Sequence, residues 1–215
     1  MIFYCKETRG NAKDGRYMAE TFTKKLMHSN TDEWYTPPEA VRILIPWLKA
    51  KGYSKILCPF DKEESNYVKV LTENGFDVTN SHIETGTDFF KINNLNEYDA
   101  IVSNPPFSKR EKILWKLFKE GVPFAMILNF NGLFDSWKRW QMFRENEFEM
   151  LIPSGRVKYF NESCNGGAPQ FQSVYVCSKL LPKQIEFVEM DSENRQEEQL
   201  PGQINIFDVM KGEAQ

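Results

Sequence analysis

Short, mainly apolar runs alternate with stretches of helical spacing along residues 54–130, and this alternation restricts the fold more than any other feature. The apolar runs are residues 54–60, 98–104 and 123–130, and the helix-like stretches are residues 65–75 and 110–121. A short run dominated by apolar residues is typical of a strand covered on both faces. The helix-like stretches end at Gly75 and Gly121, a common helix terminus. Strands separated by helices predict right-handed crossovers and an α/β fold with a doubly wound sheet.

The flanking segments extend this pattern. Residues 37–52 predict one helix that begins at two prolines and ends at a glycine, and residues 76–84 predict a further strand. Residues 148–160 and 170–181 predict two more strands, paired antiparallel at one edge. The expected architecture is a mainly parallel sheet with helices on both faces and an antiparallel edge.

Length and composition predict one globular domain with an appendage. The 215 residues include 41% hydrophobic side chains, enough for one sizeable core. We expect this domain in residues 1–185 and a flexible acidic tail in residues 186–215, which are too polar to sustain a core. No apolar run approaches the roughly 20 residues that cross a bilayer. The first residues lack the features of a secretory signal, so a cytoplasmic location is expected.

The net charge of −3 is unevenly distributed. The tail has eight acidic and two basic side chains, and the other residues have 25 basic and 22 acidic ones, a net of +3. A mildly basic body can approach a polyanion, although this excess alone is a weak indication of nucleic-acid binding. The four cysteines stand singly and the two histidines lie far apart, so no metal site is predicted.

Polar residues follow three of the predicted strands. The sequences are CPFD at residues 58–61, HIETG at residues 82–86 and SNPPF at residues 103–107. In doubly wound sheets, ligands bind at the carboxyl ends of the strands, near the point where the strand order reverses. We therefore expect these segments to line one site.

The segment Asn104-Pro105-Pro106-Phe107 resembles the catalytic signature of the S-adenosylmethionine-dependent amino-methyltransferases. The resemblance is strongest to the small adenine-specific DNA methyltransferases of phages and mobile elements, and it covers roughly residues 30–180. It implies a Rossmann-like methyltransferase fold, S-adenosyl-L-methionine as cofactor, DNA as partner, and a bacterial or phage-infected cell.

The chemistry of methyl transfer explains these residue types. An exocyclic amine of adenine is a poor nucleophile because its lone pair is delocalised into the ring. The resemblance implies that the Asn104 side-chain oxygen and the Pro105 carbonyl accept both N–H groups and stabilise the growing positive charge. Pro105 and Pro106 stiffen the turn and remove donors. Phe107 would stack on an adenine flipped out of the duplex. The alternative is an ordinary proline-rich loop with Phe107 in the core.

A second element is Tyr35-Thr36-Pro37, which resembles the Tyr-Thr-Pro segment upstream of the cofactor strand in this family. The resemblance implies that Tyr35 and Thr36 contact the methionine end of the cofactor while Pro37 opens a helix. The alternative is an ordinary helix that begins with proline.

The cofactor strand departs from the family pattern, because the turn after Cys58 contains no glycine. Family members usually carry glycines there, so that the backbone can approach the ligand. Cys58 and Asp61 still stand at the strand end, where a carboxylate can bind the amino or ribose groups of the cofactor. Ser65 is a candidate cap for the next helix.

Two further carboxylates complete the cofactor assignment. Glu84 suits the acidic residue that binds the ribose hydroxyls, with His82 as a competitor for the strand end. Asp88 resembles the carboxylate that binds the amino group of the cofactor's adenine. Phe89 is the aromatic residue that would pack on the face of that adenine ring. Each acid alone is more often a solvated loop charge.

Two segments lie outside these motifs. Residues 136–143 mix basic and aromatic side chains, and a plain amphipathic helix is favoured over a DNA-facing one. Gln203, Ile206 and Phe207 resemble the peptide by which bacterial replication proteins dock on the sliding clamp. The alternative for that peptide is a last strand or helix packed on the domain itself.

The sequence thus favours a DNA adenine methyltransferase. Alternatives are methylation of RNA adenine or of a protein glutamine, and a non-catalytic methyltransferase-fold module that binds DNA. Little of the chain is left for a separate target-recognition domain, so a short or loose target sequence is expected.

Overall fold

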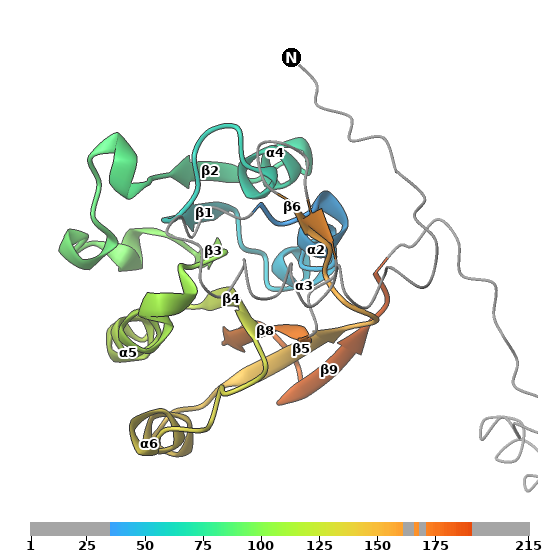
Figure 1. Ribbon diagram of the computed structural model, residues 1–215. Helices are drawn as coiled ribbons and strands as arrows, with labels where there is room; N and C mark the ends of the chain where they lie inside the picture. Colours follow the sequence, from blue (N-terminus) through green and yellow to red (C-terminus); the bar gives the residue numbers. More distant parts are fainter. Residues whose placement is uncertain (1–34, 161–165, 168–170, 191–215) are drawn as a thin grey trace, which may run out of the picture.

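The computed structural model describes residues 35–160, 166–167 and 171–190 as three layers, with a sheet between two sets of helices (Figure 1). The strands are β1 (Lys55–Cys58), β2 (Asp77–Asn80), β3 (Ala100–Ser103), β4 (Phe124–Asn129), β5 (Glu149–Pro153), β6 (Tyr159–Phe160), β7 (Gly166–Gly167), β8 (Ser173–Ser178) and β9 (Ile185–Val188). The helices are α2 (Pro38–Arg42), α3 (Ile45–Ala50), α4 (Asn66–Glu73), α5 (Arg110–Glu120) and α6 (Trp137–Glu145). Short 3₁₀ helices are η1 (Ile83–Thr85), η2 (Phe89–Lys91), η3 (Leu95–Glu97) and η4 (Phe107–Lys109).

The main sheet has seven strands in the order β2-β1-β3-β4-β8-β5-β9. Strands β2, β1, β3 and β4 are parallel, and β8 runs antiparallel to both β4 and β5. Strand β9 is parallel to β5 at the outer edge. The chain passes from β1 outward to β2 and then returns to β3 on the other side of β1, so the strand order reverses between β1 and β3. The predicted Rossmann-like α/β fold is confirmed, with antiparallel pairing toward one edge.

Alternate side chains of the strands enter two separate cores. Ile56 and Cys58 of β1 belong to the core beneath α2, α3 and α4, whereas Leu57 belongs to the core beneath α5 and α6. Figure 1 shows these two helix sets on opposite faces of the sheet. Burial on both faces explains why β3, β4 and β8 are buried at every position.

The helix predicted over residues 37–52 is instead two helices, α2 and α3. Residues 43 and 44 form a turn between them, and Pro46 stands at the start of α3. The proline ring has no N–H to continue the ladder of α2 and clashes with the preceding turn, so the helix breaks there. The prediction failed because Pro46 lies inside a run with otherwise regular apolar spacing.

Two strand predictions also differ from the structure, and one strand was not predicted. The strand predicted over residues 76–84 ends at Asn80, because His82 Nδ1 accepts the Glu84 N–H and begins η1. The strand predicted over residues 148–160 divides at Gly155, which has φ of +72° and turns the chain toward β6. β9 was not predicted, and it crosses the expected domain boundary after residue 185.

Within residues 35–160, 166–167 and 171–190, no helix has the length and apolar character needed to span a membrane. Nor does that part of the chain bring together three His, Cys, Asp or Glu side chains able to hold a metal ion.

Candidate functional site

A cavity of about 400 Å³ opens at the carboxyl ends of β1 and β3, where the strand order reverses. Its lining residues come from four segments of the chain, within residues 35–36, 59–67, 82–90 and 104–109. These segments follow β1, β2 and β3 and precede α2, as the alignment of parallel strands requires. The volume lies in the range of roughly 300–1,000 Å³ that accommodates cofactors and drug-sized ligands.

Most of the predicted site residues meet in this lining. They are Tyr35, Thr36, Asp61, Glu84, Asp88, Phe89, Asn104 and Pro106. The other four lie behind or beside it: Pro37 precedes α2, Cys58 is fully buried in β1, Pro105 is buried, and Phe107 packs between the two cores. The lining therefore combines residues from the three predicted strand ends with residues from the Tyr-Thr-Pro element.

Asp61 is the buried acid of the cavity, with a residue exposure of only 6%. Desolvation raises the pKa of its carboxyl to about 6, although the hydroxyls of Ser103 and Ser65 lower it by hydrogen bonding. Ser103 Oγ donates to Asp61 Oδ2. The backbone is also fixed, because Asp61 N donates to Ser81 O at 3.1 Å. The carboxyl group is thus held in one place and faces a space that a ligand can fill.

The glycine-free turn after β1 is closed by local hydrogen bonds. Ser65 N donates to Lys62 O at 3.0 Å, and Ser65 Oγ accepts the Val68 N–H to cap α4, as predicted. Ser65 and Asn66 both line the cavity, so the first turn of α4 faces it. A serine-capped helix start takes the place of the glycine turn seen in the family pattern.

The opposite rim carries the acids predicted after β2. Glu84 Oε2 forms an ion pair with Lys62 Nζ at 2.6 Å. His82 and Glu84, the two competitors for the ribose role, both line the cavity. Since the His82 ring nitrogen caps the Glu84 backbone, the imidazole supports this rim while the Glu84 carboxylate is more than half exposed.

Aromatic and aliphatic groups form an apolar part of the rim. Phe89 is 3% exposed and packs against Phe60 with ring centroids 4.9 Å apart. Asp88 Oδ1 accepts the Phe90 N–H and starts η2. Ile83 and Phe90 both line the cavity yet are 60% and 37% exposed. A flat apolar ring bound there would remove this surface from water.

Thr36 lines the cavity and has a buried polar side-chain atom. The residue is 4% exposed, and its Oγ1 has no hydrogen-bond partner among the residues that the structure describes. Asn66 Nδ2 donates to Thr36 O at 2.9 Å and fixes its backbone. A buried hydroxyl without a partner is costly, so this atom is suited to bind a polar ligand group.

The turn after β3 brings Asn104 and Pro106 into the lining, whereas the Phe107 ring points into protein. That ring makes edge contacts with Tyr159 and Phe171, with centroids 6.5 and 6.2 Å apart. Phe107 packs against both cores and is half-buried. Its packing anchors the turn to the fold.

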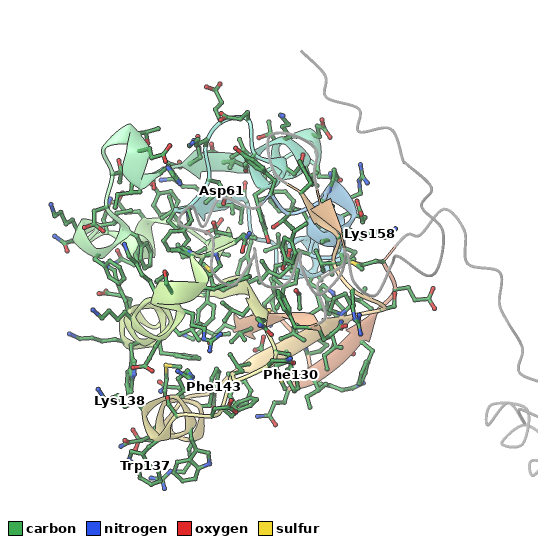
Figure 2. All side chains as sticks on the ribbon, in the orientation of Figure 1. Asp61, Phe130, Trp137, Lys138, Phe143 and Lys158 are labelled. Atoms are coloured by element: carbon green, nitrogen blue, oxygen red, sulfur yellow. The ribbon has the colours of Figure 1, made fainter. Side chains whose placement is uncertain are left out.

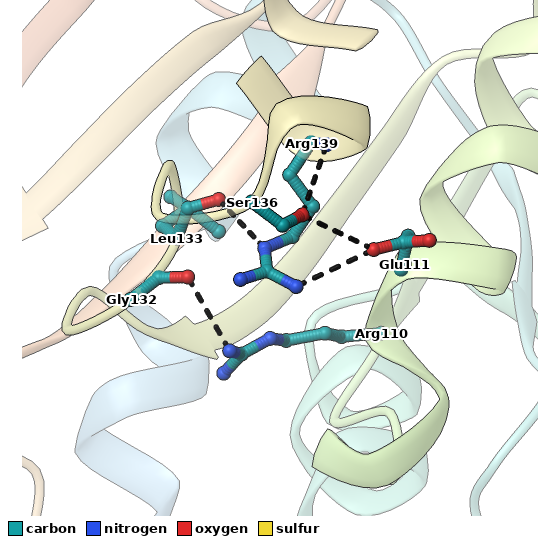
Figure 3. A network of polar contacts seen from close by, with 6 residues as sticks. All are labelled: Arg110, Glu111, Gly132, Leu133, Ser136 and Arg139. Atoms are coloured by element: carbon teal, nitrogen blue, oxygen red, sulfur yellow. Dashed lines mark hydrogen bonds and ion pairs between the residues drawn. The ribbon is translucent and has the colours of Figure 1, made fainter. Parts of the chain in front are cut away.

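A polar network supports the turn from behind, at the start of α5 (Figure 3). Glu111 Oε2 pairs with Arg139 Nη1 at 3.3 Å, and Arg139 Nε donates to Leu133 O at 3.2 Å. Arg110 Nη2 donates to Gly132 O at 3.3 Å. Desolvation and the nearby Arg139 lower the pKa of Arg110. These contacts tie residues 130–139 to the helix that follows the Asn-Pro-Pro turn.

Several residues at the cavity had no individual role assigned from the sequence. Phe60 and Ile83 line it within the segments that were expected there, whereas Lys62 and Asn66 line it from outside those segments. Ser103, also within an expected segment, supports the wall from β3. For Ser103, the available signal was a hydroxyl ending an otherwise apolar strand directly before Asn104. Lys62 gave no signal beyond its position next to Asp61.

No protein-family model matches the chain, and no curated protein matches it either. Several solved structures resemble it, among them the following three. The modification subunit assigned to a type I restriction enzyme of Vibrio vulnificus YJ016 has 11% identity and a TM-score of 0.46, over 80% of this chain and 50% of its own. The chain therefore spans half the length of that subunit.

The other two structures are methyltransferases by name. Precorrin-6y C5,15-methyltransferase from Geobacter metallireducens GS-15 has 10% identity and a TM-score of 0.41, over 70% of this chain and 96% of its own. A protein assigned as an RNA methyltransferase from Pyrococcus horikoshii has 15% identity and a TM-score of 0.38, over 75% of this chain and 98% of its own.

Proposed function

We propose that the protein transfers a methyl group from S-adenosyl-L-methionine to the exocyclic amino group of a flipped adenine in DNA. One observation carries this proposal: the cavity has Asp61 in its lining together with Asn104 and Pro106 of the turn after β3. A cofactor bound against Asp61 would therefore lie within the same chamber as Asn104, one of the two residues predicted to receive the amine.

The lining offers partners for each part of this cofactor. The partnerless Thr36 hydroxyl and Asp61 suit the charged amino-acid end, and Glu84 suits the two ribose hydroxyls. Ile83 and Phe90 present apolar surface to a purine ring, beside Asp88 for its amino group. When bound, the sulfonium supplies an electrophilic methyl group.

The chain's own residues would then prepare the nucleophile. The Asn104 amide oxygen and the Pro105 carbonyl accept the two N–H groups of the amine, so that its lone pair is less delocalised into the ring. They also stabilise the positive charge that develops on nitrogen during transfer. The proton is lost after the methyl group has arrived, so no strong base is needed at first.

Phe107 has a different position from the one expected of a free stacking residue. In the proposal, it forms the wall on which the flipped purine packs, which requires the ring to expose a face that now meets Tyr159 or Phe171.

Digestion of the methylated product to nucleosides tests the proposal. The protein is incubated with labelled cofactor and duplex DNA, RNA or protein in separate reactions, and N6-methyladenosine, its deoxy form and methylglutamine are separated. We expect label in N6-methyldeoxyadenosine. Label in RNA or protein alone would establish one of the alternative substrates. Binding of DNA without cofactor affinity would identify a non-catalytic module.

We also propose that Gln203, Ile206 and Phe207 dock on a bacterial sliding clamp. These residues lie outside the described part of the chain, and the support is their spacing behind a polar linker. Docking would raise the local concentration of the enzyme on newly made DNA.

A further inference from the structure

Helix α6 carries an exposed column of aromatic and basic side chains that the proposed chemistry does not use. Trp137 and Trp140 are 70% and 40% exposed, and their rings stack with centroids 4.8 Å apart and planes 23° apart. The guanidinium of Arg144 lies 4.9 Å from the centroid of the Trp140 ring. Figure 2 labels Trp137 at the end of the molecule farthest from Asp61 in that view, pointing away from the sheet.

The fold does not require these tryptophans. The buried side of α6 is formed by Met142 and Phe143, and Phe143 packs with Phe118, Phe134 and Phe148. A single exposed aromatic residue is ordinary, but a stacked pair covered by a cation forms a patch. The patch is therefore a candidate for recognition.

The loop that leads into α6 begins at the edge of the sheet that bears the cavity, although Trp137 itself lies far from Asp61 in Figure 2. Strand β4 is parallel to β3, so Asn129 ends at the edge where Asn104 follows β3. The chain then returns within seven residues to begin α6 at Trp137. The Glu111–Arg139 ion pair of Figure 3 fixes α6 to the helix that follows the Asn-Pro-Pro turn.

The charge of the helix favours an anionic partner. Residues 137–145 contain three basic side chains and one acidic one. Arg139 is engaged by Glu111, which leaves Lys138 and Arg144 on the outside. The pair of Arg144 with Glu145 is 3.6 Å long between side chains that are 59% and 43% exposed, and such surface pairs are weak. Lys138 and Arg144 therefore remain available to phosphates.

We propose that the α6 patch, defined as Trp137, Lys138, Trp140 and Arg144, binds a single-stranded segment of nucleic acid. The outer face of Trp137 stacks on an unpaired base, and the cations contact the backbone phosphates. This proposal rests on the proposed function, because a duplex that is opened to flip an adenine exposes unpaired bases that the α6 patch can bind. The substrate class is thereby narrowed to strands that are single-stranded or easily opened.

The test measures the affinity of the full chain for a fluorescent oligothymidine by anisotropy. We expect Trp137→Ala to weaken binding about tenfold or more, since base–aromatic stacking is lost. Trp137→Phe retains a ring and is expected to restore most of the affinity. The control is Trp115→Ala on α5, because Trp115 is also exposed, at 38%, but lies outside the patch. Lys138→Gln should reduce the slope of log affinity against log salt by about 0.7.

Equal affinity of Trp137→Ala and the wild type would overturn the proposal. So would a change confined to self-association in sedimentation, which would assign the patch to a second copy of the chain. The two proposals fail separately. If the wild type methylates DNA but Trp137→Ala binds oligothymidine normally, only the patch is rejected. If Trp137 governs oligothymidine binding but no methyl is transferred, the patch stands and the proposed function does not.

Discussion

At the scale of single residues, the carboxyl group of Asp61 links folding to ligand binding. Burial raises its pKa to about 6, and hydroxyls of Ser103 and Ser65 partly offset that effect. Burial makes this carboxyl costly to ionise, and a ligand carrying N–H donors or a positive charge would lower the free-energy cost of its ionisation. Affinity and stability should therefore depend on pH in opposite directions.

The first prediction concerns affinity. Binding of S-adenosylhomocysteine, whose amino group is cationic, favours ionised Asp61, so affinity should rise with pH and level off above about pH 6. Calorimetric titrations between about pH 5 and pH 7 measure this. Asp61→Asn should remove the dependence, whereas His82→Gln, which changes the histidine of the lining, should keep it. A pH dependence that survives in Asp61→Asn would refute the assignment.

The second prediction concerns stability without ligand. The folded pKa of about 6 lies above the ordinary value of 3.8, so the folded state binds more protons between these values. The stabilisation contributed by protonated Asp61 is complete at pH values below 3.8, and it is lost as the pH rises through about 6. Relative to Asp61→Asn, the wild-type free energy of unfolding should fall by about 2 kcal/mol from about pH 4 to pH 7. Urea denaturation at each pH measures the difference, and a flat difference would contradict it.

The sequence could predict Asp61 and Asn104 because each follows a strand, and strand ends meet at one edge of a parallel sheet. It could not predict that Ser103 would donate to Asp61, because that contact depends on the register of neighbouring strands. The inward packing of Phe107 was equally hidden, since Tyr159 and Phe171 lie far along the chain.

At the scale of elements, the ends of helices and strands decide where the site forms. Ser65 and Gly121 were readable as a helix start and a helix end, and both have those roles. Pro46 and Gly155 interrupted elements that apolar spacing alone made continuous. β9 escaped prediction because its residues alternate between exposed and half-buried positions in an acidic context.

The prediction at this scale concerns the end of α5. Gly121 has φ of +63°, where a side chain is disfavoured. Gly121→Ala should lower the free energy of unfolding by about 1 kcal/mol, seen as a lower urea midpoint at unchanged slope. Gly121→Asn should lose less, because asparagine tolerates this conformation. Equal stability of Gly121→Ala and the wild type would show that the backbone adopts another conformation there.

At the scale of the whole molecule, the topology of the sheet decides where the cavity lies. The alternation of apolar runs and helices predicted a mainly parallel, doubly wound sheet, and the reversal of strand order between β1 and β3 sets where the cavity opens. The expected tail begins near β9, whose outer edge bears the exposed Phe187.

The prediction at this scale concerns the clamp peptide. Replacing Gln203 and Phe207 together by alanine should abolish capture of the protein by an immobilised bacterial sliding clamp, because both anchors are removed. Methylation of short DNA, which carries no clamp, should be unchanged. Normal capture of the double variant would show that these residues do not mediate docking.

The central claim is that one cavity holds the cofactor while the Asn104 turn receives the amine. Asn104→Ala tests it most directly, with transfer rate and S-adenosylhomocysteine affinity measured on the same preparation. The account predicts a rate at least about 100-fold lower, since a preorganised acceptor is lost, with affinity unchanged within about twofold. Asn74→Ala, which changes an amide at the end of α4, serves as the control. Methyl transfer by Asn104→Ala at the wild-type rate would contradict the account.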